Sequence, residues 1–575
     1  MESKIKKLIG EALENLDIEV NTISVEHPAD VAMGDYSTSI ALAIAKNIGE
    51  NPKALAEKIV AEINRLNTFS EIEKVEVAGP GFINFRLSRK FFSSAIEEIV
   101  NSGNNVGKNE TLAGQKIMIE YTDPNPFKPF HIGHLMTNAI GESIARVLEH
   151  SGADVSRANY QGDVGLHVAK AIYGLLKEES LQDMTVSHTE QAANIGRAYV
   201  AGATAYEEDP IAKEQIDEIN KKIYDKSDEN INKIYEWGFE ATMKAFEDLY
   251  KILGTKFDFY FLESNVAIPG RELVRDNVGK VFEESDGAIV FKGEKFSEDG
   301  KPKLHTRVFM TSKGLPTYEA KELGLAEEKF AANPNMVLNI TITANEQKEY
   351  MRTVYKALSL IHPEYESKMK HITHGMMRLQ SGKMSSRKGN VVTGESLLRD
   401  TIALVREKIQ DRGLSEAEKD TVAEIVGVAA VKYSILRQST GGDIAYDFDT
   451  SISFEGDSGP YLQYSYARAH SVLEKAQKEN VLPDFDYIPE QTFEVEKFLY
   501  QFPEVVRRAA GEYEPHYIAN FSIEVARAFN SFYGNTVIVD KADKTSQYKV
   551  ALTYAFSFVM KTGLHLLGIK APEKM

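Results

Sequence analysis

The sequence predicts an α/β protein built on a parallel sheet, with a small α+β domain before it and an all-α domain after it. Three observations predict this fold class. Strand and helix patterns alternate in the middle of the chain, helical periodicity fills almost all of it beyond residue 395, and the first 110 residues combine helices with two strands. We therefore predict domains at 1–110, 111–394 and 395–575 in this chain of 575 residues.

The N-terminal domain is predicted from three helical stretches and a hairpin. Apolar residues recur at helical spacing over Ile5–Leu16, Ser37–Gly49 and Asn51–Leu66, and Asn followed by Pro is a favourable helix start. Lys74–Leu87 predicts two strands around a Gly-Pro-Gly turn. The polar stretch Asn101–Gln115 predicts a linker to the next domain.

The central domain has the strand–helix–strand order of a parallel, nucleotide-binding type of sheet. Lys116–Thr122 and Val155–Gln161 predict strands, and Leu135–Leu148 between them predicts a helix. Further strands are predicted at Met336–Ala344 and His371–Met377. The more charged stretch 190–300 breaks this order, and we interpret it as an insertion.

Composition excludes several kinds of chemistry. The chain has no cysteine, which excludes disulfides, cysteine-bound zinc, iron–sulfur clusters and thiol nucleophiles. Its 67 Lys+Arg and 85 Asp+Glu give a net charge of −18, so a polyanionic partner must meet a locally basic surface. The N-terminus lacks the apolar core of a signal peptide, and no apolar run approaches the ~20 residues of a membrane span. We expect a cytoplasmic protein without a membrane partner.

Two motifs indicate chemistry on a polyphosphate. His131-Ile132-Gly133-His134 follows a strand and a proline-rich loop at a helix start, where Gly133 leaves room for a ligand and the helix end favours an anion. The alternative is a surface HxxH or half of a metal site. Gly382–Gly389 holds three cations and two hydroxyls between glycines, which suits a loop over a leaving pyrophosphate. Its alternative is a solvated basic turn.

The two motifs in this order resemble the HIGH and KMSKS motifs of class I aminoacyl-tRNA synthetases. The second reads KMSSR here, with Arg387 in place of the second lysine. Further segments along the whole chain are similar to arginyl-tRNA synthetases: Gly34–Tyr36, Glu120–Asn125, Asn159–Gly165, Leu315–Tyr318, Gly459–Tyr464, Ala528–Tyr533 and Gly568–Met575.

This resemblance implies a Rossmann-like catalytic domain with an insertion, an N-terminal domain that contacts the tRNA elbow, and a helical anticodon-binding domain. It also implies arginine–tRNA ligation through arginyl-adenylate, with transfer to the terminal 2′-OH of tRNA(Arg), by a monomer. Mg²⁺ is expected with ATP, and no metal site made by protein ligands is predicted.

The resemblance also implies site residues. It gives catalytic roles to His131, His134, Lys383 and Lys128, the last standing where the family often has a lysine that compensates for the altered KMSKS. The implied ATP-binding residues are His131, Gly133, His134, Gly162, Asp163, Gly165, Met376, Lys383, Met384 and Ser385. The implied arginine-binding residues are Glu120, Asp123, Asn125, Tyr318, Glu322 and Gln347. Glu322 occupies a position where the family usually has aspartate, so the contact geometry is expected to differ.

The sequence indicates the residues that contact tRNA less specifically than it indicates those that bind ATP and arginine. Aromatic residues of the helical end either stack on anticodon bases or form helix-packing core: Tyr461, Tyr464, Tyr466, Phe529, Phe532 and Tyr533. Arg468, Arg507, Arg508 and Arg527 are either phosphate partners or ordinary surface charges, and Asp35 and Tyr36 either lie near the tRNA elbow or form a structural turn.

Three alternative functions remain open at this point. One is a class I synthetase for another amino acid, such as lysine or glutamate. A second is a non-catalytic tRNA-binding derivative, and a third is a small-molecule nucleotidyltransferase with an HxGH motif. The intact first motif and Lys383 favour an active enzyme, and the long helical C-terminal domain favours a tRNA substrate.

Overall fold

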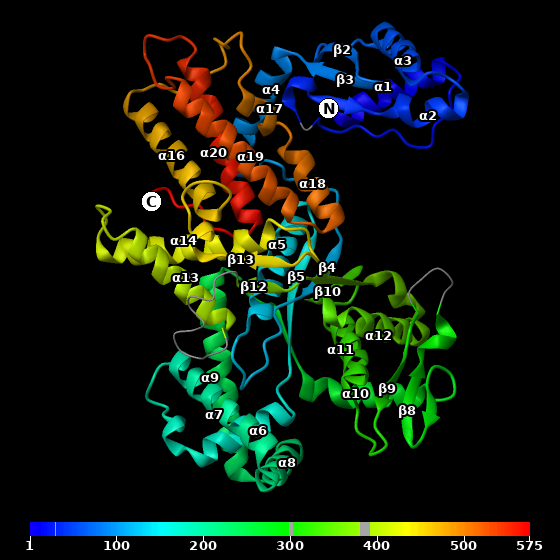
Figure 1. Ribbon diagram of the computed structural model, residues 1–575, viewed down its shortest axis with the longest axis vertical. Coiled ribbons are helices and arrows are strands. Elements are labelled where there is room, and N and C mark those ends of the chain that lie inside the picture. The colour runs from blue at the N-terminus through cyan, green and yellow to red at the C-terminus, as the bar shows by residue number, and fades with distance from the viewer. Residues whose placement is uncertain (29, 298–302, 380–391) are drawn as a thin grey trace. The chain divides into compact units, whose positions relative to one another are not determined.

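The computed structural model describes residues 1–28, 30–297, 303–379 and 392–575 (Figure 1). The chain forms two compact units. Unit 1 comprises Met1–Val106, Ser465–Glu504 and Ser522–Thr562, and unit 2 comprises Gly107–Tyr464, Val505–Phe521 and Gly563–Met575. The three predicted domain boundaries stay a prediction.

Unit 1 begins with a three-stranded antiparallel sheet packed against helices. The strand order is β1-β3-β2, with β1 at Tyr36–Thr38, β2 at Ile72–Ala78 and β3 at Phe82–Leu87. The buried faces of α1 (Glu2–Asn15) and α3 (Pro52–Leu66) share one apolar core with the sheet. These elements confirm the predicted hairpin and two of the predicted helices.

The start of the second predicted helix, Ser37–Gly49, is wrong. Tyr36–Thr38 pairs with β3, and α2 spans only Ile40–Ile48. Burial of all three strand residues between neighbouring elements outweighs the helical periodicity. By contrast, Asn51 caps α3 as expected, because its side chain accepts the backbone N–H groups of Lys53 and Ala54.

The C-terminal region is helical, as predicted. Unit 1 also contains α4 (Arg89–Ser102) and α17 (Glu494–Leu499). It further contains parts of four longer helices whose other parts belong to unit 2. These longer helices are α16 (Gly459–Lys478), α18 (Phe502–Glu512), α19 (His516–Asn535) and α20 (Ser546–Leu566).

Unit 2 is organised around a parallel five-stranded sheet with the order β11-β10-β4-β5-β6. Its strands are β4 (Lys116–Glu120), β5 (Asp154–Gln161), β6 (Phe259–Leu262), β10 (Leu338–Ala344) and β11 (Met369–His374). Helix α5 (Ile132–His150) connects β4 to β5. The first strand along the chain is therefore central, and the order reverses between β4 and β10, as in doubly wound nucleotide-binding sheets.

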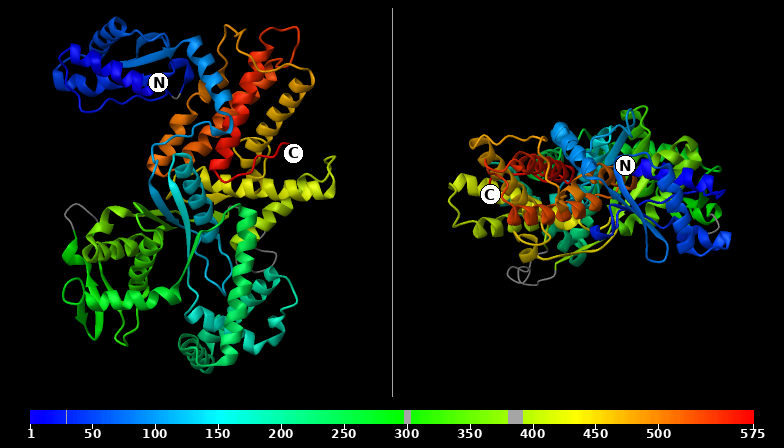
Figure 2. Two further views of the ribbon diagram at one scale, coloured as in Figure 1. Left: turned by 180° about the vertical axis from the view of Figure 1, so that it is seen from behind. Right: turned by 90° about the horizontal axis from the view of Figure 1, so that it is seen from above.

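The stretch 190–300 contains more than an insertion. It includes helices that pack together in unit 2 (Figures 1 and 2), yet β6 within it belongs to the main sheet. The sequence pattern missed β6 because the strand has only four residues. Helix α6 (Leu166–Lys177) precedes this stretch. The helices of the stretch itself are α7 (His188–Glu208), α8 (Pro210–Asp225), α9 (Glu229–Leu253) and α10 (Glu263–Asp276).

A second, antiparallel sheet and two helices precede the last strands of the main sheet. The sheet has the order β7-β8-β9, with β7 at Glu283–Ser285, β8 at Ala288–Lys292 and β9 at Thr306–Met310. Helix α11 (Tyr318–Ala332) leads to β10, and α12 (Lys348–Ile361) leads to β11. The two helices share an apolar core with this sheet.

The chain then leaves the main sheet for the helical region. The predicted strand His371–Met377 is divided, because β11 ends at His374 and β12 spans Met377–Leu379. β12 pairs in parallel with β13 (Ile444–Tyr446), a short strand within the helical region. The adjoining helices are α13 (Gly394–Lys408), α14 (Glu416–Leu436) and α15 (Phe448–Ser451). Within the described parts of the chain, no helix is both long and apolar enough to span a membrane.

Candidate functional site

The candidate site lies where the strand order of the main sheet reverses. β4 and β10 are neighbours and parallel, so their carboxyl ends meet at one edge of the sheet. In open sheets of this kind, ligands bind in the crevice outside that edge. Glu120 ends β4, and Gly162 follows the end of β5 on the other side of β4. Fold topology alone therefore brings the predicted segments 120–125 and 159–165 to the same edge of the sheet as the end of β10.

His131 and His134 form the N-terminal cap of α5. The backbone N–H of His134 donates to Nδ1 of His131 at 3.4 Å, and the backbone N–H of His131 donates to Nδ1 of His134 at 3.2 Å. The two rings stack with centroids 3.4 Å apart. A Cβ at Gly133 would lie 3.0 Å from Cε1 of His131, so the glycine leaves room for the His131 ring.

This arrangement determines which ring nitrogen of each histidine carries the proton. Burial lowers the pKa of His134 well below its ordinary value and also lowers the pKa of His131, so both rings are neutral near pH 7. Because each Nδ1 accepts a backbone N–H, the ring proton belongs on Nε2. The helix start thus offers two Nε2–H donors beside the positive end of the helix dipole, which suits phosphate oxygens.

Lys128 lies in the loop that precedes the histidine pair. Its Nζ lies 5.6 Å from the ring centroid of Tyr199, on α7. Burial, and then the nearby Lys170, lower the pKa of Lys128. The charge of Lys128 also contributes to the lowered pKa of His131, so this lysine lies in the electrostatic neighbourhood of the histidine pair.

The loop after β5 contains three predicted ATP-binding residues in different environments. The backbone N–H of Gly162 donates to Oδ1 of Asn125 at 2.9 Å, and a Cβ at Gly162 would lie 2.6 Å from that oxygen. Gly165 has φ +117° and caps α6. The carboxylate of Asp163 is buried and accepts from the backbone N–H and hydroxyl of Ser264 and from Tyr235. The Asp163 side chain therefore supports the loop.

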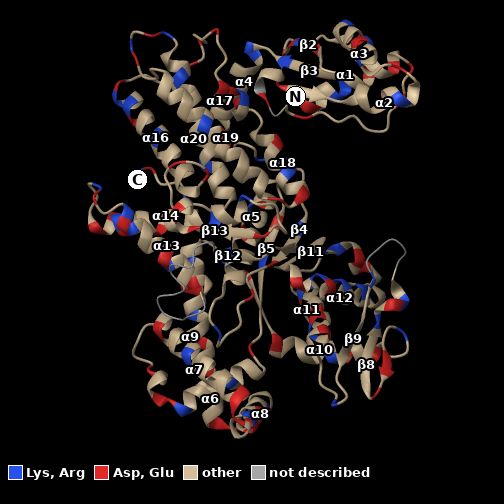
Figure 3. Cartoon of the chain, in the orientation of Figure 1, with Lys and Arg blue, Asp and Glu red and all other residues tan. Residues whose placement is uncertain are grey.

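The predicted arginine-binding residues gather around a group of acids. Glu120 is buried and forms an ion pair with Lys329 at 2.5 Å. Burial and the neighbouring Glu120 raise the pKa of Asp123 well above its ordinary value, and the same two causes raise the pKa of Glu322 to about 8. Three carboxyl groups thus share one buried lysine. Glu322 belongs to α11, whose acidic residues are red in Figure 3.

A group of buried carboxyl groups with too few cations favours the binding of a further cation. Carboxyl groups that raise one another's pKa are destabilised as anions unless a cation enters among them. A guanidinium is planar, always charged and carries five N–H donors, so it can donate hydrogen bonds to two or three carboxylates at once.

Tyr318 and Gln347, also predicted to bind arginine, are both exposed. Tyr318 begins α11 and is 67% exposed, with Nζ of Lys321 5.2 Å from its ring centroid. Lys321 in turn donates to the buried carboxylate of Glu263. Gln347 is exposed and immediately precedes α12.

Glu263 and Tyr160 belong to this neighbourhood although the sequence analysis did not assign them to it. Burial, and then Glu322 and Glu263, raise the pKa of Tyr160, whose buried hydroxyl has no hydrogen-bond partner among the described residues. The sequence could have assigned Tyr160 to the site, because this residue lies in the segment Asn159–Gly165 at the end of β5. No sequence feature could have assigned Glu263, because a long helical stretch separates it from β5.

Part of the predicted ATP site lies outside the described residues. Lys383, Met384 and Ser385 fall in 380–391, as do the rest of the KMSSR segment and Arg387. Met376, which precedes that segment, is 53% exposed, and its backbone N–H donates to Asp443 at 2.8 Å.

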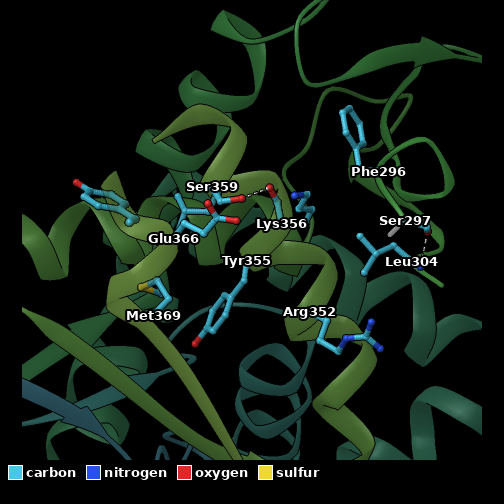
Figure 4. Close-up of a pocket in the computed structure, with 11 residues that line it drawn as sticks. Phe296, Ser297, Leu304, Arg352, Tyr355, Lys356, Ser359, Glu366 and Met369 are labelled. Carbon is cyan, nitrogen blue, oxygen red and sulfur yellow. Dashed lines mark hydrogen bonds between the residues drawn. The ribbon is translucent and has the colours of Figure 1, made fainter. Parts of the chain in front are cut away.

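A cavity of about 230 Å³ lies beside α12 (Figure 4). Its walls include Phe296, Leu304, Arg352, Tyr355 and Met369. Its walls include none of the described residues predicted to bind ATP or arginine, so the candidate site does not depend on it.

The residues considered for tRNA contact divide into buried and exposed groups. In unit 1, Asp35 and Tyr36 are buried, and the Tyr36 hydroxyl donates to Glu504 at 2.7 Å. Both side chains therefore have structural positions in unit 1. Phe529 and Phe532 are also core residues, whereas Tyr533 is 42% exposed beneath the guanidinium of Arg468.

Three family models match the chain. The model described as "tRNA synthetases class I (R), catalytic domain" matches residues 95–448. "Arginyl tRNA synthetase N terminal domain" matches residues 3–87, and "DALR anticodon binding domain" matches residues 462–575.

Whole-length relatives agree with these models. A protein of Halothermothrix orenii named arginine–tRNA ligase is 30% identical over 576 residues, which cover 100% of this chain and 99% of the relative. One of Fusobacterium nucleatum with the same name is 32% identical and covers 98% of this chain and 97% of the relative. The solved structure of Thermus thermophilus arginyl-tRNA synthetase has a TM-score of 0.80 at 23% identity, with both chains fully covered, and so shares the fold.

Proposed function

This chain belongs to the arginyl-tRNA synthetase family of class I, and we propose that it ligates arginine to tRNA through the residues at the reversal point of its sheet. In the first step an oxygen of the arginine carboxylate attacks the α-phosphorus of ATP, the bond to the β-phosphate oxygen breaks, and pyrophosphate leaves. In the second step the terminal 2′-hydroxyl of tRNA(Arg) attacks the arginyl carbonyl, and AMP leaves. No side chain becomes covalently attached, so catalysis consists of positioning and charge stabilisation.

The ATP phosphates are proposed to bind at the start of α5. The two Nε2–H donors of His131 and His134 and the helix dipole support this assignment. Gly133 lets the ATP approach the backbone closely. Mg²⁺ would accompany ATP and neutralise charge on the phosphate oxygens.

Two lysines are proposed to stabilise the leaving pyrophosphate. Lys383, with Met384 and Ser385 beside it, is assigned to this role by the family motif. Lys128 is the second candidate, supported by its charge near His131. Gly162, Gly165 and Met376 are proposed to contact the adenosine part of ATP, with Asp163 supporting their loop.

The observation that most strongly supports arginine as the substrate is the group of acids at Glu120, Asp123 and Glu322, with one buried lysine among them. The guanidinium is proposed to lie against Glu322 and Tyr318, with Asn125 and Gln347 as further acceptors. Glu120 is assigned to the α-amino group. Lysine offers a single point charge and would leave buried acceptors unpaired, at about 1–3 kcal/mol each.

The test is a charging assay with total tRNA and radiolabelled arginine, with lysine and canavanine as competitors. Arginine is expected to be attached, canavanine to compete because it retains the flat guanidino group, and lysine to compete poorly. Charging by another amino acid in place of arginine would refute the proposal. Pyrophosphate exchange without tRNA is expected to be nearly silent, as is general in the family.

The resemblance also suggests a monomer that acts in the cytoplasm. Analytical ultracentrifugation of the charging-competent enzyme tests the first point, and a sedimenting mass of twice 64.2 kDa would contradict it.

A further inference from the structure

Helix α5 and the arginine-binding segment are joined by side chains outside the predicted site. The segment Glu120–Asn125 follows β4, and α5 carries the histidine pair at its start. Two further turns of α5 present Asn138, Gly141 and Glu142 to that segment, and these residues are buried.

The segment turns through a costly backbone conformation. Thr122 has φ +80° and Asp123 has φ +46°, in the left-handed region that glycine favours and that a β-branched residue such as threonine rarely adopts. Such conformations persist only where the surroundings hold them in place, and they often lie at ligand sites.

Tyr121 provides the first of three contacts that hold this turn. Its fully buried hydroxyl donates to Oε2 of Glu142 at 2.6 Å and lies 3.0 Å from the hydroxyl of Thr255. The ring packs directly on Gly141, where a Cβ would approach the ring to 2.3 Å.

Glu142 is a rigid acceptor for that hydroxyl. Burial alone would raise the pKa of Glu142, but Arg146 and Arg157 lower it to about 2, so the group is a carboxylate at neutral pH. Arg146 lies 2.6 Å and Arg157 3.0 Å from its oxygens. Loss of the tyrosine hydroxyl would therefore leave Glu142 with charged partners.

The other two contacts act on the turn residues themselves. The side-chain amide of Asn138 donates to Oγ1 of Thr122 at 3.0 Å. The backbone N–H of Tyr160 donates to Oδ1 of Asp123 at 2.8 Å. The turn is thus held by α5 on one side and by β5 on the other.

We propose that Tyr121 is a positioning residue for amino-acid binding: its hydroxyl, held by Glu142 of α5, fixes the left-handed turn that places Asp123 and Asn125 in the arginine site. This rests on the proposed function. Tyr121 does not touch substrate in this account. It acts through the turn, and it makes the arginine segment part of the same rigid body as the ATP-binding helix.

The test is Tyr121→Phe, which removes one oxygen and keeps the ring against Gly141. In tRNA charging, arginine KM is expected to rise about 5- to 10-fold while kcat and ATP KM stay within about twofold, because substrate binding is lost uniformly in ground and transition states. Thr122→Val removes the second contact isosterically and is expected to give the same split if Tyr121→Phe folds poorly.

The matched control is Tyr446→Phe. Tyr446 is also buried in unit 2, and its hydroxyl lies 2.9 Å from that of Thr401. Both variants are expected to lose similar thermal stability, and only Tyr121→Phe to change arginine KM. An unchanged arginine KM, or equal changes of both KM values in both variants, would overturn the inference. If the wild type does not charge tRNA with arginine at all, the proposed function has failed instead.

Discussion

Arginine binding should release a proton from Glu322. Burial and Glu120 raise the pKa of this carboxyl group to about 8 in the free protein, so at pH 7 it is mostly protonated. A guanidinium favours the carboxylate form and lowers that pKa when it binds. Arginine affinity should therefore rise with pH up to about 8 and level off above it.

The size of the effect follows from the pKa. With a value near 8, about 0.9 proton is released per arginine at pH 7, and the dissociation constant falls about 15-fold between pH 6.5 and pH 8. Glu322→Gln removes the charge and one charge-assisted contact. The variant should bind arginine about 10- to 100-fold more weakly at pH 8, at about 1.5–3 kcal/mol, and should lose the pH dependence.

Isothermal titration calorimetry measures both quantities. Titrations of arginine in two buffers with different ionisation enthalpies give the number of protons released, and a series from pH 6.5 to pH 8 gives the affinity. Glu328→Gln is the matched control, because Glu328 lies on the same helix and burial also raises its pKa, without the acid group around it.

Two results would refute this reasoning. One is an arginine affinity that stays constant from pH 6.5 to pH 8 with no proton release in the wild type. The other is a Glu322→Gln variant that keeps the wild-type pH dependence, which would assign the titration to another group.

Three further predictions concern other parts of the molecule. His134→Ala should slow adenylate formation about 100-fold in single-turnover assays, and an unchanged rate would exclude a phosphate contact. Lys432 is fully buried and burial lowers its pKa to about 7, so above pH 7 the unfolded chain binds more protons than the folded chain and the free energy of unfolding rises with pH. Lys432→Met should abolish about 2 kcal/mol of that rise between pH 7 and pH 9, as measured by urea unfolding. A variant whose free energy of unfolding rises with pH as steeply as that of the wild type would contradict this prediction. Tyr36→Phe should lower the melting temperature by loss of the Glu504 hydrogen bond and leave tRNA KM unchanged, and a raised tRNA KM with an unchanged melting temperature would indicate direct contact instead.

The sequence predicted the central sheet well where the pattern was long and its ends were marked. β4, α5 and β5 follow the predicted ranges closely, because apolar runs and a capped helix start specify them locally. β1 and β6 escaped prediction because they have three and four residues and depend on pairing with distant strands.

The residues of the candidate site likewise divide into those specified by local sequence and those that depend on tertiary packing. His131 and His134 could be placed at a helix start because the motif and the cap are local. The contact of Tyr121 with Glu142 and the approach of Glu263 to the acids depend on tertiary packing, which no pattern in one sequence specifies. The role of Asp163 at the nucleotide stays a prediction, and the three hydrogen bonds that its buried carboxylate accepts from Ser264 and Tyr235 also depend on tertiary packing.

The most direct test of the account is a crystal structure with arginine and a non-hydrolysable ATP analogue. The account predicts the guanidinium within hydrogen-bond distance of Glu322, and phosphate oxygens at Nε2 of His131 and His134. A guanidinium bound away from the three acids, or a nucleotide in a different crevice, would contradict it.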